Sequence, residues 1–221
     1  MSPQKVIVFG IGKLAEYICY VLKHDSCYHV SALSIHKQYM PEVRTLWGLN
    51  IIDFDLLEQT YSPDEYKLFI AVGNNSVRDS IYKQAKGRGY SFISYISSKA
   101  TVWEDLKYGD NVIVSEGTVI GPFVEVGTGS FLLGPKVAHH CIIGKFTILS
   151  ACYLGGDSKI GDISFLGMNS TVNQHVIVGF ANVIGVGSNI CFNTNDYEVF
   201  TNKGTVKRDL SSQDLKNRYL A

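Results

Sequence analysis

The chain has 221 residues and a mass of 24.5 kDa, which allows one or two domains. Hydrophobic residues make up 46 % and charged residues 18 %, so a core can form and a disordered chain is excluded. Lys and Arg balance Asp and Glu at 20 each, so no basic field drives nucleic-acid binding.

The opening segment MSPQKVIVFGIGK enters a strand-like run at once, and we expect no signal peptide. No apolar stretch approaches the roughly 20 residues of a membrane span. The five cysteines are odd in number and have no C-x-x-C spacing. They predict reduced thiols in a cytoplasmic protein, without a disulfide framework or a metal site.

Residues 4–95 alternate between apolar runs and helical spacing. The pattern predicts strands at 5–9, 29–34, 67–72 and 90–94, and helices at 16–23 and 76–87. Strand–helix alternation of this kind predicts a small parallel α/β sheet. We assign it to a Rossmann-like domain over residues 1–98.

From about residue 101 a period of six begins. An aliphatic or aromatic residue recurs fifteen times with two one-residue slips: Tyr108, Val114, Ile120, Val126, Leu132, Val137, Ile143, Leu149, Leu154, Ile160, Leu166, Val172, Val178, Ile184 and Ile190. Nine of them are followed directly by Gly, at corners where a Cβ would clash. Three hexads make one triangular coil, so residues 99–195 predict a parallel β-helix of five coils. Residues 196–221 form a tail with a short helix near its end.

A Gly-rich turn, Gly10-x-Gly12-x-x-Ala15, lies between the first strand and the first helix. Its backbone N–H groups, and Lys13 beside them, suit a pyrophosphate at a helix N-terminus. The stretch after Ala32, at the end of the second strand, reads Leu-Ser-Ile-His-Lys and lacks the acidic residue that NAD prefers. The turn therefore favours a nucleotide-sugar pyrophosphate over NAD.

Four further candidates follow the strand at 67–72: Gly73, Asn74, Asn75 and Arg78. They fall at the carboxyl edge of the sheet, where sheets of this type bind ligands. Arg78 can pair with a phosphate, or it is an ordinary arginine on a helix surface.

Three stretches resemble a bacterial family of sugar-nucleotide N-acyltransferases. They are Lys5 to Ala15, Phe69 to Arg78, and Val137 to Phe146. The family includes the UDP-4-amino-sugar N-acetyltransferase of bacillosamine synthesis and the sialic acid O-acetyltransferases. The resemblance implies a left-handed β-helix of hexapeptide repeats that binds CoA, and an α/β domain that holds the nucleotide-linked sugar. It also implies homotrimers with active sites between subunits.

Two adjacent histidines, His139 and His140, occupy hexad positions that face away from the helix axis. The resemblance places a general base at His139 and an oxyanion donor at the backbone N–H of Gly156. An attacking amine must lose a proton, which a neutral imidazole accepts. Two departures leave the role of His140 open: the bacillosamine enzyme has glutamate there, and its second histidine aligns with Ile148. The base can therefore be His139, His140 or neither side chain. Loss of the second histidine is also compatible with a different acyl group, such as a hydroxyacyl chain longer than acetyl.

The CoA candidates come from turns of successive coils. They are Gly167, Met168, Asn169, Gly185, Val186 and Gly187, with Lys203, Lys207 and Arg208 for the CoA phosphates. The six turn residues are equally explained as ordinary coil structure, and the three basic residues as solvated surface cations.

The resemblance implies transfer of an acyl group from acetyl-CoA or another acyl-CoA to the amine of a UDP- or dTDP-linked amino-deoxy sugar. It also implies a product of surface polysaccharide biosynthesis. Three alternatives stay open: an O-acetyltransferase of the sialic acid type, a non-catalytic binding protein, and a trimeric β-helix carbonic anhydrase. The last needs three histidines on zinc, and the adjacent pair and His175 are poorly spaced for it.

Overall fold

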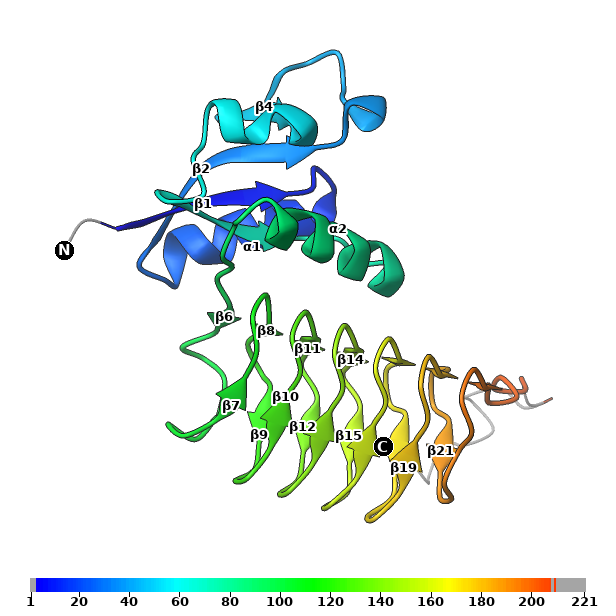
Figure 1. Ribbon diagram of the computed structural model, residues 1–221. Helices are drawn as coiled ribbons and strands as arrows, with labels where there is room; N and C mark the ends of the chain where they lie inside the picture. Colours follow the sequence, from blue (N-terminus) through cyan, green and yellow to red (C-terminus); the bar gives the residue numbers. More distant parts are fainter. Residues whose placement is uncertain (1–2, 208, 210–221) are drawn as a thin grey trace, which may run out of the picture.

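The computed structural model describes residues 3–207 and residue 209. An α/β domain at the N-terminus sits on a parallel β-helix, and α2 lies along the top of its coils (Figure 1). The two-domain fold expected from the sequence is confirmed. The short helix expected at 211–221, and Arg208, fall outside the described residues.

The N-terminal sheet has five strands in the order β3-β4-β2-β1-β5. Their bounds are β1 (Gln4–Phe9), β2 (Tyr28–Ile35), β3 (Thr45–Leu46), β4 (Leu49–Asp53) and β5 (Tyr66–Ile70). All neighbours are parallel except the β3–β4 hairpin, which the sequence did not predict. The strand predicted at 90–94 is wrong. Phe92 makes one isolated bridge to Leu68, because the chain leaves the sheet there to enter the β-helix.

Helical segments cover both faces of this sheet: α1 (Lys13–His24), α2 (Asn75–Gly87) and the 3-10 helices η1 (Lys37–Tyr39) and η2 (Phe54–Gln59). On one face Ile18 and Leu22 of α1 pack in the same buried cluster as Phe131 of the β-helix. The other face packs against η2 and α2. One continuous apolar layer therefore joins the two domains.

The β-helix has three parallel sheets. The domain-facing sheet contains β6 (Tyr95–Ile96), β8 (Ile113–Val114), β11 (Phe131–Leu133), β14 (Ile148–Ser150), β17 (Phe165–Leu166), β20 (Val183–Ile184) and β22 (Val199–Phe200). The second sheet contains β9 (Val119–Ile120), β12 (Lys136–Val137), β15 (Tyr153–Leu154), β18 (Thr171–Val172) and β21 (Asn189–Ile190). The third contains β7 (Lys107–Tyr108), β10 (Glu125–Val126), β13 (Ile142–Ile143), β16 (Lys159–Ile160) and β19 (Ile177–Val178). Because β6 and β22 belong to the domain-facing sheet, pairing starts before residue 99 and continues past residue 195.

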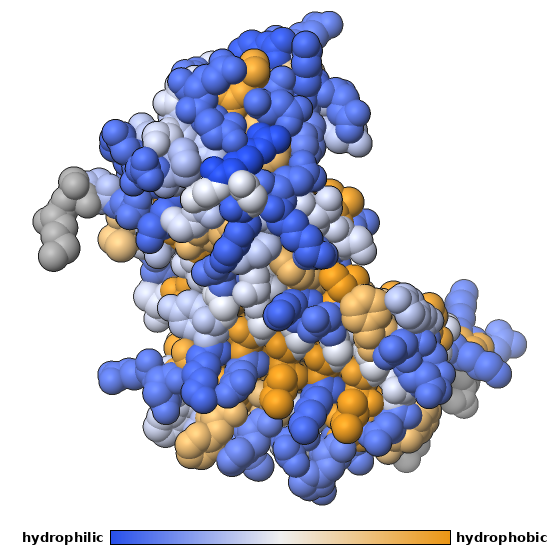
Figure 2. Space-filling model, in the orientation of Figure 1, coloured by the Kyte–Doolittle hydropathy of each residue, from blue (hydrophilic) through white to orange (hydrophobic). Residues whose placement is uncertain are grey.

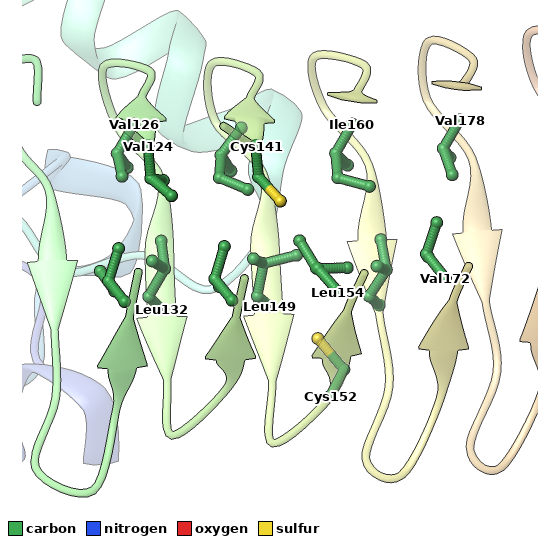
Figure 3. Packing of buried hydrophobic residues seen from close by; sticks show 14 of the residues in the cluster. Val124, Val126, Leu132, Cys141, Leu149, Cys152, Leu154, Ile160, Val172 and Val178 are labelled. Carbon is green, nitrogen blue, oxygen red and sulfur yellow. The ribbon is translucent and has the colours of Figure 1, made fainter. Parts of the chain in front are cut away.

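The predicted hexad residues stack inside these coils (Figure 3). Val137, for example, pairs with Leu154 one coil later. Fourteen of the fifteen are buried; the exception is Tyr108, which is half exposed. Tyr108 lies on the first strand of its sheet, and Val102 and Leu106 pack against the end of the core instead.

The corners combine two different backbone requirements. A Cβ on Gly144 would lie 2.5 Å from the backbone nitrogen of Asp162 in the next coil, which confirms why Gly follows the aliphatic residue. The left-handed conformation falls elsewhere, usually three residues after the aliphatic, and most of its occupants are not glycine. They include Asn111, Phe123, His140, Phe146, Ala151, Asp157, Ile163, Asn169, His175 and Ala181.

Within residues 3–207, no helix combines the length and the apolar character that crossing a membrane requires.

Candidate active site

The two histidines lie on the edge of the β-helix that faces away from the N-terminal domain. We call this edge, between the second and third sheets, the histidine corner; it comprises residues 121–123, 138–140, 155–157 and 173–175. The domain-facing sheet forms the opposite side of the triangular coil, because its outward residues pack into the core of the N-terminal domain. Groups at this corner are therefore open to a partner other than the chain's own N-terminal domain.

His139 and His140 are both exposed and their rings contact each other. Their Nδ1 atoms are 3.0 Å apart, and the two rings are nearly perpendicular, at 86°. The His140 ring also leans on Phe123 of the preceding coil, with centroids 4.7 Å apart. The pair expected from the sequence is thus a hydrogen-bonded unit, with each ring aimed at a different coil.

Gly156 lies directly beside the ring of His139. A Cβ added there would be 3.0 Å from Nε2 of His139 and 2.8 Å from Cε1. Asp157 N–H donates to the carbonyl of His139 at 2.9 Å, which fixes the two corners against each other. Within the described part of the chain, the Gly156 N–H has no backbone acceptor. The structure therefore places a ring nitrogen of His139 beside a residue whose N–H donor is unengaged; that the two act as base and oxyanion donor stays a prediction.

The next coils add a hydrogen bond between side chains that the sequence did not predict. His175 donates from Nδ1 to the Asp157 carboxylate at 3.0 Å, and this hydrogen bond holds the pKa of Asp157 below its usual range. A cavity of about 380 Å³ opens beside His140, lined by Phe123, Asp157 and Lys159 among others. Asp157 and His175 are 18 positions apart, which is one coil of three hexads. The hexad register in the sequence could therefore have predicted that the two residues are neighbours in successive coils.

The Gly-rich turn lies at the carboxyl ends of the parallel strands. Gly10 has φ +128°, and a Cβ there would be 2.9 Å from the carbonyl oxygen of Ala71. Gly12 is the exposed N-cap residue of α1, and Lys13 is exposed and paired with Glu16 at 2.7 Å. Gly73 is exposed at the end of neighbouring β5. Gly10, Gly12, Lys13 and Gly73 therefore share one edge of the sheet.

A cavity of about 460 Å³ at the end of β2 adds His36, Lys37, Gln38 and Asp55 to this edge. Asp55 supplies a carboxylate that is missing from the residues directly after β2. The sequence pattern did not indicate it, because it comes from η2, which begins directly after β4 and is separated from β2 by two strands.

Arg78 corrects one prediction. Its side chain is fully buried, and it donates to the carbonyls of Gly129 (2.8 Å), Val72 (2.6 Å) and Phe146 (3.2 Å). Burial lowers its pKa to about 9, which leaves it charged at neutral pH. A phosphate cannot reach this guanidinium, so both the phosphate role and the alternative of a surface arginine are wrong. Arg78 ties the end of β5 to two corners of the β-helix.

The two asparagines before Arg78 are also engaged with protein groups. Asn75 Nδ2 donates to the carbonyls of Ile163 and Ser164, both at 3.0 Å, and its Oδ1 accepts from Arg78. Asn74 caps α2 by accepting from Val77 N–H at 3.0 Å. The Asn74-Asn75-x-x-Arg78 segment is thus largely a helix cap and a connection between the domains.

The six CoA candidates lie together at the corner between the domain-facing and second sheets. Gly187 N–H donates to the carbonyl of Met168 at 2.9 Å, which links their two coils. Met168 and Val186 project outward and are more than half exposed. Asn169 and Gly187 both have the left-handed conformation. The second sheet separates this corner from the histidine corner, so the two sets line opposite edges of one face.

A cavity of about 810 Å³ lies between α2 and the remaining corner, with Tyr82, Lys145, Phe146 and Tyr197 among its lining residues. Nothing in the sequence pointed to it. Among residues 3–207 and 209, no group of three or more His, Cys, Asp or Glu side chains is arranged to hold a metal ion.

This arrangement defines a hexapeptide-repeat β-helix protein with a Rossmann-like domain and a histidine pair on an outer corner. Residues 5–85 match the family model of the PglD N-terminal domain. One curated relative, the bifunctional protein GlmU of Zymomonas mobilis, is 31 % identical over 96 residues. That match covers 38 % of this chain and only 21 % of the length of GlmU.

Two solved structures share the fold over most of the chain. The acetyltransferase domain of PglB from Neisseria gonorrhoeae, in complex with acetyl coenzyme A, has a TM-score of 0.80 at 23 % identity, over 89 % of this chain and 95 % of that one. A histidine-to-alanine variant of GDP-perosamine N-acetyl transferase from Caulobacter crescentus, in complex with CoA and GDP-perosamine, has a TM-score of 0.80 at 24 % identity, over 88 % and 92 %. The resemblance drawn from the sequence is confirmed: residues 5–85 are similar to the PglD N-terminal domain, and the chain shares the fold of these two sugar N-acetyltransferases.

Proposed function

We propose that this protein transfers an acyl group from acyl-CoA to the amine of a nucleotide-linked amino sugar, with His139 as the general base. The observation that carries the proposal is the placement of His139 Nε2 beside Gly156, whose N–H has no backbone acceptor within the described residues. The fold shared with CoA-bound sugar N-acetyltransferases supports it.

The chemistry follows from these two groups. The sugar amine attacks the thioester carbonyl, and a C–N bond forms while the carbonyl oxygen becomes an oxyanion. The Gly156 N–H stabilises that oxyanion. His139 takes the proton that the nitrogen must lose. The C–S bond then breaks, and the CoA thiolate takes the proton from His139, which restores the neutral imidazole.

The two substrates approach from different parts of the fold. We place the acyl-CoA along the second sheet, with the turns at Met168 and Val186 at one end and the histidine corner at the other. We place the nucleotide at the edge formed by Gly10, Gly12 and Gly73. Lys203 and Lys207 are exposed and available to the CoA phosphates.

A homotrimer explains how the two sites meet. The histidine corner faces away from the chain's own N-terminal domain, so a second copy must supply the nucleotide-binding edge. Hydrophobic residues on the visible surface gather over the β-helix rather than over the N-terminal domain (Figure 2). We expect sedimentation at about 74 kDa, three times the 24.5 kDa of one chain. A monomer would contradict a shared site. We place the reaction in the cytoplasm, where acyl-CoA is available.

The test measures thiol release from acetyl-CoA and 3-hydroxybutanoyl-CoA against UDP-, dTDP- and GDP-linked 3- and 4-amino sugars. Release that requires one amino sugar supports the proposal and identifies both substrates. His139→Ala is expected to lower kcat by about 100-fold to 10,000-fold. His24→Ala, at the end of α1, is the matched control and is expected to leave the rate unchanged. No release from folded trimer with any pair refutes the proposal, and release with a hydroxyl acceptor alone indicates O-acylation.

A further inference from the structure

His140 is held by the coil that precedes it, and His139 by the coil that follows. The N–H of His140 donates to the carbonyl of Pro122 at 3.1 Å, and its ring packs on Phe123. The ring of His139 lies against Gly156 instead. The left-handed backbone of His140, with φ +59°, allows two consecutive side chains to diverge in this way and still bring their Nδ1 atoms within 3.0 Å.

A contact between two imidazole nitrogens is a hydrogen bond only when one carries a proton and the other has a free lone pair. If His140 donates, His139 must carry its own proton on Nε2, which then cannot accept one from a substrate. If His139 donates from Nδ1, its Nε2 is a free lone pair on the side of Gly156. Only the second arrangement gives a base beside the oxyanion donor.

We propose that His140 is a positioning residue that accepts the Nδ1 proton of His139 and so keeps Nε2 of His139 free as the base. This inference rests on the proposed acyl transfer. His140 touches neither Gly156 nor the reacting atoms, and it acts through the tautomer and the orientation of its neighbour. An isolated neutral imidazole does not hold a single tautomer in one orientation, so the partner of Nδ1 decides which nitrogen is free.

The side chains around His140 leave it free for this role. Asp157, the nearest carboxylate along the corner, is bonded to His175, and Lys107 is paired with Glu125 at 3.0 Å. Neither pair is hydrogen-bonded to His140 within the described residues, although all of these residues except His175 line the adjacent cavity.

The first test compares three variants in the thiol-release assay. His140→Phe removes the acceptor, and Phe already occupies the same left-handed corner position at residues 123 and 146, so the coil is preserved. We expect kcat to fall by about 10-fold to 100-fold, as for partners that orient a functional histidine, with KM for acyl-CoA unchanged. His140→Glu supplies a carboxylate acceptor and is expected to recover most of the rate. His139→Glu, the matched control on the other ring, is expected to abolish it.

The second test does not depend on activity. Ring ¹⁵N shifts of histidine-labelled protein at pH 8, above the usual imidazole pKa of about 6.5, report which nitrogen of His139 carries the proton. We expect Nδ1–H in the wild type and a shift toward Nε2–H in His140→Phe. An Nε2–H tautomer in the wild type overturns the inference, as does full kcat in His140→Phe or activity in His139→Glu. If the enzyme transfers no acyl group but His139 shows the Nδ1–H tautomer, the proposed function fails and the role of His140 on His139 stands.

Discussion

Gly156→Ala is expected to slow acyl transfer without unfolding the β-helix. The new Cβ would be 2.8 Å from Cε1 of His139, and ordinary contact begins at 3.4 Å, so the ring must move by at least 0.6 Å. The backbone of Gly156 is outside the left-handed region, and the His139 ring is exposed, so it can shift without displacing core side chains; stability should change by less than about 0.5 kcal/mol. A displacement of 1 Å costs catalysis about 100-fold, so a loss in kcat of about 10-fold or more is expected.

The adjacent glycine provides the contrast. A Cβ on Gly155 would meet the backbone nitrogen of Gln174 at 2.4 Å, and two coils would have to separate. Gly155→Ala should therefore lose about 1–3 kcal/mol of stability, as overpacked cores do. Gly87→Ala, in the last turn of α2 with open space around it, should leave kcat unchanged and should not lower the melting temperature, because Ala favours the helix over Gly. The assays are thiol release at saturating substrate and thermal unfolding. Full activity in Gly156→Ala would refute the claim that the ring beside Gly156, His139, is the base. A melting temperature as low as that of Gly155→Ala would show that the activity is lost through destabilisation and not through displacement of the His139 ring.

Two further predictions concern the domain junction. Arg78→Met should lower the free energy of unfolding by at least about 3 kcal/mol in urea titrations, because several buried carbonyls lose a charged donor; a loss below 1 kcal/mol would contradict this role. Hydrogen bonds from Ser98 and Tyr95 hold the pKa of Asp25 well below its usual range. The stability that they contribute is therefore fully present above the ordinary carboxyl pKa of about 3.9, and it is lost progressively as the pH falls from there through the lower folded-state pKa. Asp25→Asn should melt lower than the wild type at pH 7, and the difference in melting temperature should narrow steadily as the pH falls below 4; a difference independent of pH would count against this role.

The β-helix could be predicted because its rule repeats fifteen times. Each inward residue meets its equivalent one coil away, as Leu149 meets Leu166, so one exception does not hide the period. Tyr108 is such an exception, since the first strand of a stack has a neighbour on one side only. The role of the glycines was predictable because it also repeats: each glycine that follows an inward aliphatic residue allows the next coil to approach.

The left-handed corner positions could not be predicted, because their residues share no chemistry. Phe123, His140 and Asp157 occupy equivalent positions in three successive coils. Their conformation is imposed by hydrogen bonds between coils, such as Asp157 N–H to the carbonyl of His139. The geometry that makes His139 and His140 a hydrogen-bonded pair therefore comes from residues about 17 positions away. The sequence located both histidines but could not say that their Nδ1 atoms meet.

Arg78 shows the opposite case, in which a local rule pointed to the wrong partner. An arginine after a buried parallel strand is well placed for phosphate, and nothing in residues 69–78 argues otherwise. Its acceptors, Gly129 and Phe146, are 51 and 68 residues further along the chain. Because Arg78 also holds the carbonyl of Val72, the end of β5 is fixed to the β-helix. The edge that we propose for the nucleotide therefore has a fixed position relative to the coils of its own chain. In the proposed symmetric trimer, the packing of the β-helices would then set the distance from that edge to the next copy's His139.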